Sequence, residues 1–278
     1  GKAIIVKSEF GADSTIIDLK NNGRAFIFEN EEDSLSILDG FTILNGLNDL
    51  GGGISCLSNS SPTIKNCILS NCLSNSGGAI YVDHSSPAII NCTIYTCKAD
   101  LGGGIWLGNS LSTITNSTLL YNTAFGSDNS RGGGIYINNF SDIYIYNCTF
   151  IVNTSSGGAG IHSKGQSKLK LSKSNISNNI GTGIDTRYSM INIESSVIEE
   201  NSGYGLYLKN TIDTTTISKT IIKFNLNENI YVSGSDINID NSLLIDKTQS
   251  NVYVKSDASL NMDFCTVVQS NNIFYNQF

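Results

Sequence analysis

The sequence predicts an all-β solenoid in which about twelve coils stack into one domain covering residues 1–278. Two observations carry this prediction: a glycine-rich tetrad recurs along the chain, and a second phrase recurs between successive tetrads. The composition agrees, because 40% of the residues are hydrophobic and only 15% are charged. A disordered chain would hold fewer β-branched and aromatic residues, so disorder is excluded.

The tetrad sets the length of one coil. GGGI occupies 51–54, 102–105 and 132–135, and GGAI occupies 77–80. The last residue of each tetrad is an anchor position, and the same column is continued by Ile4, Phe26, Ile161, Ile184, Leu206, Ile230, Val252 and Ile273. From Ile54 onward, successive anchors lie 21 to 30 residues apart. A unit of this length cannot bury its apolar face alone and must stack on its neighbours.

The second phrase supplies further strands within each coil. It reads SPTIKNCIL at 61–69, SPAIINCTI at 86–94, LSTITNSTL at 111–119 and SDIYIYNCTF at 141–150. These alternating segments are too short for helices, and Gly, Asn and Ser separate them. Coils spaced by about 4.8 Å would form a rod about 55–60 Å long. The leucine-rich repeat is excluded, because its Leu-x-x-Leu-x-Leu pattern is absent.

Aligned coils place equivalent side chains in columns. Alternation predicts that each anchor and the residue two positions later face inward, as at Cys56, Val82, Leu107 and Ile137, together with Ile64, Cys67 and Leu69. We expect bends at Asn66, Asn91, Asn116 and Asn147, because Asn tolerates left-handed backbone. A further column, Asn122, Asn153, Asn179, Asn201 and Asn225, is expected to hydrogen-bond from coil to coil. We interpret these columns as architectural.

The seven cysteines allow three interpretations. Cys67 with Cys72, and Cys92 with Cys97, form two C-x4-C pairs one coil apart. The cysteines can be small buried hydrophobes, an inter-coil disulfide (Cys67–Cys92 or Cys72–Cys97), or a metal site. Buried hydrophobes are favoured, since in-register side chains point the same way and C-x4-C departs from common zinc spacing. No metal site is predicted.

Several of these elements resemble a known family. The tetrads, the FxxN element at 150–153 and the phrase LDGFTILNG…GGGI at 38–54 are similar to repeats of chlamydial polymorphic outer-membrane proteins and of bacterial β-helix surface proteins. Nearly the whole chain resembles a right-handed parallel β-helix of the pectin-lyase-like superfamily. The resemblance implies a single-stranded right-handed solenoid. It leaves the activity open, because that superfamily contains enzymes, adhesins and passive scaffolds.

One outward column is rich in aromatic residues. The residue after each anchor is expected to face solvent, and from Ser55 these are Ser55, Tyr81, Trp106, Tyr136, His162, Asp185, Tyr207, Tyr231, Tyr253 and Phe274. This column is called the stripe below. Its aromatic members Tyr81, Trp106, Tyr136, Tyr207, Tyr231 and Tyr253 are candidate ligand-binding residues, on which sugar rings would stack. The alternative is that these rings stabilise neighbouring strands on an exposed face.

The stripe is interrupted by polar residues at two adjacent coils. His162 with Lys164, and Asp185 with Arg187, have the outward parity of their strands and are expected to lie together. The resemblance to pectin-lyase-like enzymes implies that Lys164 or Arg187 could remove the proton α to a uronate carboxylate, with Ca²⁺ offsetting the charge. His162 is then an alternative acid or base and Asp185 an orienting group. Neither three clustered acids for Ca²⁺ nor a paired-Asp motif is found, and a salt-bridged patch explains the four residues equally well.

The longest coil carries an insert at 124–131, with Phe125 and Arg131 as candidate contact residues. The net charge of −7 argues against a nucleic-acid partner, and no apolar run is long enough to span a membrane as a helix. The chain is expected to be a fragment of a longer protein.

We favour a non-enzymatic rod, either secreted or at the cell surface, that binds a glycan or cell-envelope partner along the stripe and needs no cofactor. One alternative is a polysaccharide lyase or hydrolase acting on an acidic glycan near His162–Arg187, the only case that would require Ca²⁺. Another is an extracellular fibre subunit that associates end to end through exposed strand edges.

Overall fold

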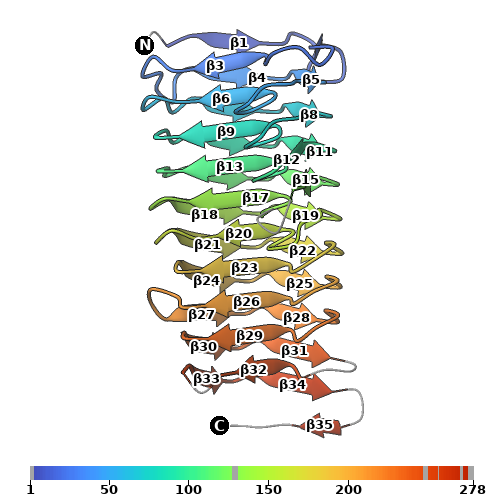
Figure 1. Cartoon of the computed structure of the whole chain (residues 1–278), viewed down its shortest axis with the longest axis vertical. Coiled ribbons are helices and arrows are strands. Elements are labelled where there is room, and N and C mark those ends of the chain that lie inside the picture. The colour runs from blue at the N-terminus through green and yellow to red at the C-terminus, as the bar shows by residue number, and fades with distance from the viewer. Residues whose placement is uncertain (1–2, 127–130, 247–249, 256, 270–271, 275–278) are drawn as a thin grey trace.

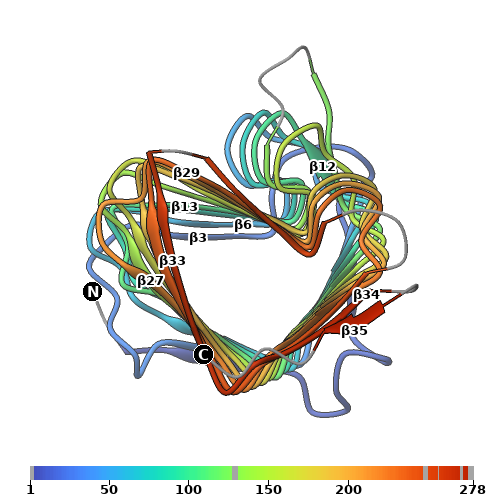
Figure 2. The same cartoon turned by 90° about the horizontal axis from the view of Figure 1, so that it is seen from below.

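The computed structural model describes residues 3–126, 131–246, 250–255, 257–269 and 272–274, and it confirms the all-β parallel solenoid. Successive coils stack along one axis from β1 to β34 (Figure 1). Viewed along that axis, three long sheets enclose the interior (Figure 2). They are named here sheet 1, sheet 2 and sheet 3, in the order in which each coil enters them.

The strands are short, and each pairs with its equivalent in the next coil. Sheet 1 contains β1 (Ile5–Lys7), β4 (Ile37–Asp39), β7 (Thr63–Lys65), β10 (Ala88–Ile90), β14 (Thr113–Thr115), β18 (Asp142–Tyr146), β21 (Lys168–Ser172), β24 (Met190–Glu194), β27 (Thr215–Ser218), β30 (Asp236–Asp240) and β33 (Ser259–Asp263). Sheet 2 contains β2 (Ile16–Asp18), β5 (Thr42–Leu44), β8 (Ile68–Ser70), β11 (Thr93–Tyr95), β15 (Thr118–Leu120), β19 (Thr149–Ile151), β22 (Asn175–Ser177), β25 (Val197–Glu199), β28 (Ile221–Lys223), β31 (Leu243–Asp246), β34 (Thr266–Gln269) and β35 (Asn272–Phe274).

Sheet 3 carries the anchors. It contains β3 (Phe26–Phe28), β6 (Ile54–Cys56), β9 (Ile80–Asp83), β13 (Ile105–Gly108), β17 (Ile135–Asn138), β20 (Ile161–Ser163), β23 (Ile184–Arg187), β26 (Leu206–Lys209), β29 (Ile230–Ser233) and β32 (Val252–Val254). A small fourth sheet pairs β12 (Lys98–Ala99) with β16 (Thr123–Ala124).

The coil number is about ten, slightly lower than the expected twelve. Two anchor assignments were wrong. Ile4 adjoins β1 in sheet 1, where its carbonyl accepts a hydrogen bond from the N–H of Ile37. Ile273 lies in β35, which folds back antiparallel on β34 and pairs Ile273 with Val268. Both residues match the anchor column in sequence only, because local alternation does not specify which sheet a strand joins.

The interior matches the predicted columns. Every inward residue named from the alternation, from Cys56 to Ile137 and from Ile64 to Leu69, is fully buried in one continuous apolar core. The bends between sheet 1 and sheet 2 also lie where expected, since Asn66, Asn91, Asn116 and Asn147 all have φ between 51° and 53°.

The buried Asn column forms a continuous amide ladder. Nδ2 of Asn122 donates to Oδ1 of Asn153 at 3.1 Å, and the same bond links Asn153 to Asn179, Asn179 to Asn201 and Asn201 to Asn225. Each of these oxygens also accepts the backbone N–H of the preceding Asn. The ladder satisfies polar groups that would otherwise be buried without partners, which explains a row of amides inside an apolar core.

Five coils carry an additional loop, the arm, between sheet 2 and sheet 3. It comprises residues 46–53, 72–79, 97–104, 122–126 with 131–134, and 153–160. Parallel bridges hold it together, including Leu47–Leu73, Leu73–Lys98 and Leu101–Arg131. In Figure 2 the arm stands outside the enclosed interior, around β12. Later coils replace it with a tighter turn: 71–79 connects β8 to β9, but only 178–183 connects β22 to β23.

Candidate functional site

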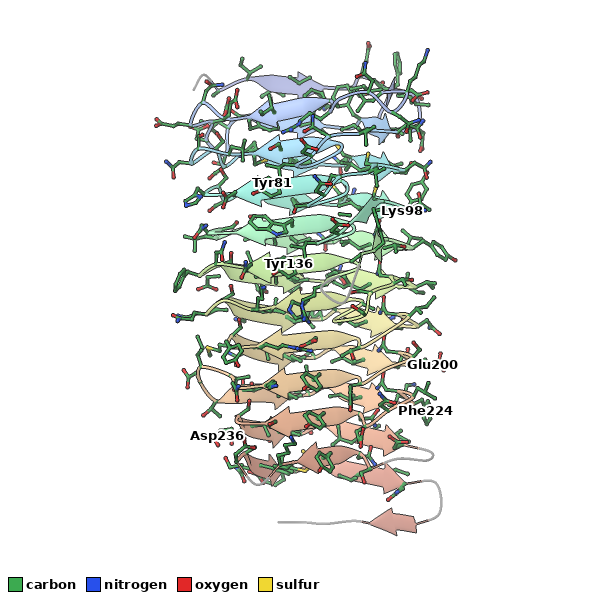
Figure 3. The ribbon with its side chains drawn as sticks, viewed as in Figure 1. Tyr81, Lys98, Tyr136, Glu200, Phe224 and Asp236 are labelled. Atoms are coloured by element: carbon green, nitrogen blue, oxygen red, sulfur yellow. The ribbon has the colours of Figure 1, made fainter. Side chains whose placement is uncertain are left out.

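The stripe forms one continuous row across sheet 3, as predicted from Ser55 to Tyr253. Strand pairing aligns Ser55 with Tyr81, Tyr81 with Trp106, and so on through Tyr136, His162, Asp185, Tyr207, Tyr231 and Tyr253. Figure 3 shows Tyr81 and Tyr136 on this face. The predicted last member, Phe274, belongs to β35 in sheet 2 and is not part of the row.

The first half of the stripe does not face solvent, which corrects the prediction. Tyr81 and Trp106 are each 8% exposed, Tyr136 is 1% exposed, and His162 is fully buried. Ser55 and Asp185 are buried as well. These six residues are called the covered half. Tyr81, Trp106 and Tyr136 form an apolar cluster of their own, outside the main core, with Leu57 and Leu101 packed against it.

The arm explains this burial, because its returning segment crosses the outer surface of sheet 3. Gly158 has a φ of 60°, and a Cβ there would lie 2.9 Å from Cβ of His162. The first glycine of the tetrads therefore permits close approach of the arm to the stripe. The shortening of the anchor spacing after Ile161, from 26 residues to 23, marks the end of the arm and was the sequence signal for it.

Ring stacking occupies the faces of the aromatic side chains. Tyr81 and Trp106 stack with ring centroids 4.5 Å apart, and Tyr136 stacks on the ring of His162 at 5.5 Å. Further along, Tyr207 stacks on Tyr231 at 4.8 Å with the planes 4° apart. A sugar lying along the row would meet ring edges and hydroxyl groups. The expectation that sugar rings stack on these faces is therefore not supported by the geometry.

The second half of the stripe is accessible. Tyr207 and Tyr231 are half-buried, and Tyr253 is 45% exposed. These three residues are called the open half. Tyr204, from the short turn that replaces the arm, lies across the rings of Tyr207 and Tyr231 at 5.4 and 5.3 Å.

The polar interruption lies at the boundary between the two halves. His162 and Asp185 are direct strand partners, and Nδ1 of His162 lies 3.5 Å from Oδ2 of Asp185. Arg187 binds the same carboxylate with two hydrogen bonds, Nε–Oδ1 at 2.9 Å and Nη2–Oδ2 at 2.8 Å. Lys164 extends away from Asp185, with Nζ 5.5 Å from the ring centroid of Tyr136. Three of the four predicted residues are thus in contact, but His162 and Asp185 are buried.

Burial and charge shift the pKa values of these groups. Burial lowers the pKa of His162 below its usual value, and the Asp185 carboxylate offsets this effect only in part. Burial alone would raise the pKa of Asp185, but His162 and Arg187 outweigh it and the net pKa is lowered. The bond to Asp185 raises the pKa of Arg187. A neutral imidazole beside an ionised carboxylate–guanidinium pair is the resulting state near pH 7.

A column of basic residues begins beside His162 and Asp185, at the end of the covered half, and continues beside the open half. Two positions after the stripe, consecutive coils hold Lys164, Arg187 and Lys209, and Lys255 follows two coils later. The same column holds Asp83, Gly108 and Asn138 beside Tyr81, Trp106 and Tyr136. Arg187 lies over the ring of Tyr207 at 5.1 Å. Lys164, Lys209 and Lys255 form no salt bridge with any residue that the structure describes.

All seven cysteines are free in the structure. Six are buried, and only Cys265 is partly accessible. The thiols of Cys67, Cys72, Cys92 and Cys97 donate hydrogen bonds to backbone carbonyls two residues earlier. Burial raises the pKa of Cys97 well above its usual value. Among the described residues, no group of three or more His, Cys, Asp and Glu side chains is placed to hold a metal ion.

The insert contributes one described contact residue to a groove on the arm. Phe125 is 43% exposed and lines this groove, whereas Arg131 lies elsewhere, beside Gly157. Residues 127–130 of the predicted insert lie outside the described residues. No helix in the described chain is both long and apolar enough to cross a membrane.

Comparison with known proteins agrees with the fold. A family model described as a right-handed β-helix region matches residues 3–153 and 133–277. The A-module of the Azotobacter vinelandii mannuronan C-5 epimerase AlgE4 has a TM-score of 0.52 and 12% identity, over 94% of this chain and 80% of that one. PfbA, a surface adhesin of Streptococcus pneumoniae, has a TM-score of 0.47 and 12% identity, over 92% and 82%. A search of curated proteins finds no match.

Proposed function

The chain belongs to the right-handed β-helix family, and from that premise we propose that it is a non-enzymatic rod, secreted or at the cell surface, that binds an acidic glycan. The proposed binding surface is the open half of the stripe together with the basic column, which begins two coils before it. Its residues are Tyr204, Tyr207, Tyr231, Tyr253, Lys164, Arg187, Lys209 and Lys255.

The concentration of positive charge is the observation that carries this proposal. The whole chain has a net charge of −7, yet Arg187 and Lys209 in sheet 3 share one column with Lys164 and Lys255, which directly follow β20 and β32, and Arg187 is paired with Asp185. A local positive surface on an acidic protein attracts polyanions and repels cationic partners. Regular spacing along the rod, about 4.8 Å per coil, suits a polymer that carries charges at regular intervals.

The tyrosines would contribute through their edges. Their ring faces are occupied by stacking, with Tyr231 and Tyr253 at 5.4 Å, so the hydroxyl groups are what a ligand meets. The nearby Tyr231 hydroxyl raises the pKa of Lys255 above its usual value. Hydroxyl groups and cations arranged in parallel rows can bind the hydroxyl and carboxylate groups of a uronate chain.

The lyase alternative is weakened by the burial of two candidate residues. His162 and Asp185 are covered by the arm and by their neighbours, and a polymer cannot reach them without displacing that cover. Arg187 is bound to Asp185, and its raised pKa makes it a poorer base. Catalysis would then depend on Lys164, which forms no salt bridge among the described residues and whose Nζ lies over the ring of Tyr136. Ca²⁺ is part of this alternative only.

The fibre alternative concerns the ends of the rod. At the C-terminal end, β35 pairs antiparallel with the outer edge of β34, which opposes extension of sheet 2 by a second copy. End-to-end association remains an alternative for sheets 1 and 3. It is tested by measuring molar mass over a range of concentrations, where a fibre subunit would grow and a discrete rod would not.

The test of the proposed surface is binding of mannuronan and of an uncharged dextran at low and high salt. Mannuronan, the polymer in the name of the Azotobacter enzyme, is a suitable uronate probe. We expect the triple variant Lys164→Gln, Lys209→Gln, Lys255→Gln to bind mannuronan about tenfold more weakly, and added salt to weaken the wild type similarly.

A matched control removes the same charge elsewhere. The triple variant Lys20→Gln, Lys98→Gln, Lys219→Gln changes three lysines outside the basic column. We expect it to bind mannuronan as the wild type does. Equal weakening in both triple variants, or equal binding of dextran and mannuronan, would contradict the proposed surface.

A further inference from the structure

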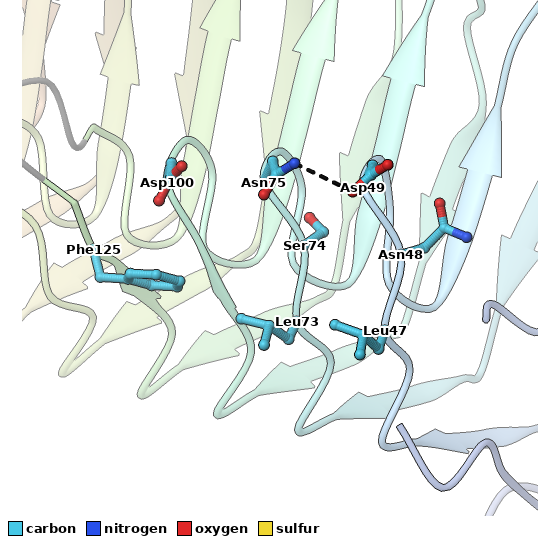
Figure 4. Close-up of a pocket in the computed structure, with 8 residues that line it drawn as sticks. All are labelled: Leu47, Asn48, Asp49, Leu73, Ser74, Asn75, Asp100 and Phe125. Atoms are coloured by element: carbon cyan, nitrogen blue, oxygen red, sulfur yellow. Dashed lines mark hydrogen bonds between the residues drawn. The ribbon is translucent and has the colours of Figure 1, made fainter. Parts of the chain in front are cut away.

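The arm carries a groove separate from the stripe. Its cavity has a volume of about 590 Å³, within the range of ligand pockets. Figure 4 shows its lining, which comes from four successive coils: Leu47, Asn48, Asp49, Leu73, Ser74, Asn75, Asp100 and Phe125.

The groove has an apolar floor. Leu47 and Leu73 are paired by a parallel bridge between neighbouring coils, the exposed Lys98 follows Leu73 in the same column, and Phe125 lines the groove in the next coil. Their side chains are 42%, 39% and 43% exposed. Three large apolar side chains exposed together on a curved surface favour a ligand with an apolar face.

The rim of the groove is acidic. Asp49, Asn75 and Asp100 occupy the tips of three successive arm loops (Figure 4), and Nδ2 of Asn75 donates to Asp49 at 3.4 Å. At the end of the groove opposite Asp100, Arg24 donates a hydrogen bond to the side chain of Asn48. The positive charge of Arg24 also attracts the carboxylate of Asp49. Asp100 forms no salt bridge within the described chain. Asp100, which lies next to Phe125, is therefore a rim carboxylate without an ion-pair partner in the described chain, and Lys98 is the nearest lysine in sequence.

We propose that this groove binds a linear glycan containing unacetylated amino sugars, with one protonated amine near Asp100 and Phe125. A carboxylate attracts the ammonium group, and an aromatic ring adds a cation–π contact. The floor would contact the apolar faces of the sugar rings, and the amide and hydroxyl groups of Asn48, Ser74 and Asn75 would bind sugar hydroxyls. The same carboxylates repel the uronates assigned to the open half of the stripe.

The spacing of the coils favours a glycan over an extended basic peptide. Equivalent side chains repeat about every 4.8 Å along the groove. One hexose in an extended chain advances by a similar distance. Side chains on one face of an extended peptide repeat about every 6.6–6.8 Å, so a peptide would lose register with the floor after one coil.

The experiment compares three oligomers of equal length by calorimetry: β-1,4-linked glucosamine, its N-acetylated form, and mannuronan. We expect the glucosamine oligomer to bind the groove and the N-acetylated oligomer to bind at least about tenfold more weakly, because acetylation removes the charge. Asp100→Asn and Phe125→Ala should each weaken glucosamine binding by about tenfold or more. The Lys164, Lys209, Lys255 triple variant should bind glucosamine as the wild type does, which separates this site from the stripe.

Matched controls identify non-specific attraction to an acidic protein. Asp142→Asn removes one negative charge from sheet 1, and Phe10→Ala removes an exposed ring outside the groove. The proposal is overturned if Asp142→Asn weakens glucosamine binding as much as Asp100→Asn does. It is also overturned if both oligomers bind equally, or if a lysine- and leucine-containing peptide binds the groove more tightly than the glucosamine oligomer.

Discussion

Nδ1 of His162 lies 3.5 Å from Oδ2 of Asp185, and the arm of the solenoid buries both side chains against sheet 3. Among the described residues, neither ring nitrogen of His162 has a hydrogen-bond partner. The ring stacks on Tyr136 of the preceding coil and is paired with Asp185 of the following coil. This pair accounts for the first of the following predictions.

The stability of the protein should fall as the pH decreases from about 7 toward 5, because of His162. Burial lowers its folded pKa below the unfolded value, so the unfolded state binds the proton more readily. The stabilisation that comes from burying neutral His162 is complete above the pKa of an unfolded histidine, about 6.5. It is lost as the pH falls toward the folded pKa, and the free energy of unfolding then decreases by at most about 1.4 kcal/mol per pH unit. Urea unfolding at several pH values measures it.

Two variants isolate this effect. His162→Phe keeps a ring in the stack and should flatten the dependence between pH 7 and 5. His84→Asn removes the only other histidine, which is exposed, and should leave the dependence unchanged. Asp185 also stabilises the folded state, because its pKa is lowered on folding. That stabilisation is lost only at more acidic pH, as the pH drops through the folded pKa of Asp185. An unchanged slope in His162→Phe would refute the assignment.

Trp106→Ala should destabilise the fold by about 3–5 kcal/mol, the usual cost of deleting a large buried aromatic side chain. Trp106 stacks on Tyr81 at 4.5 Å and also covers Gly108, where a Cβ would lie 2.2 Å from the indole. Denaturant unfolding measures the change, with the exposed Phe10→Ala as a control expected within about 0.5 kcal/mol. If folded Trp106→Ala lost mannuronan binding without losing stability, the covered half would be a binding surface after all.

Asn153→Ala should destabilise the fold by about 2–5 kcal/mol, because each buried polar group left without a partner costs about 1–3 kcal/mol. The Asn153 amide accepts the backbone N–H of Asn122 at 3.0 Å and donates to the carbonyl of Leu119 at 2.9 Å. Asn238→Ala, at an exposed strand position, is the control and should change stability little. Similar unfolding midpoints for the two variants would argue against a stabilising ladder.

Cys265 should react first with a thiol reagent in the native protein, because the other six cysteines are buried. All seven thiols should react after unfolding without reductant. The test is a timed thiol titration with mapping of the labelled residue by mass spectrometry. A count of five after unfolding would instead indicate a disulfide, with Cys67–Cys92 and Cys72–Cys97 as the pairs to examine.

Most of the fold could be predicted because its determinants are local and repeated. The anchor spacing, the bend at Asn66 and the amide column from Asn122 each recur in several coils, so the alignment of coils reveals them. The two wrong anchors, Ile4 and Ile273, lie at the ends, where a coil has a neighbour on one side only. Periodicity cannot assign a strand to a sheet there.

The candidate site was predicted less well, because exposure depends on what packs over a strand. Alternation correctly placed Tyr136 outside the main core, but the arm that covers it comes from a different part of the coil. The groove at Phe125 was missed for the same reason, since it combines residues from four coils. The insert at 124–131 was the sequence signal that pointed to it.

The central claim is that this rod binds an acidic glycan without cleaving it. The most direct measurement is incubation with mannuronan and other uronate-containing polysaccharides, with and without Ca²⁺, followed by mass spectrometry of the bound and free material. The account predicts that intact polymer is retained, that retention decreases with salt, and that no shorter products form. Shorter unsaturated products that disappear in Lys164→Ala would contradict it and would make the protein a lyase.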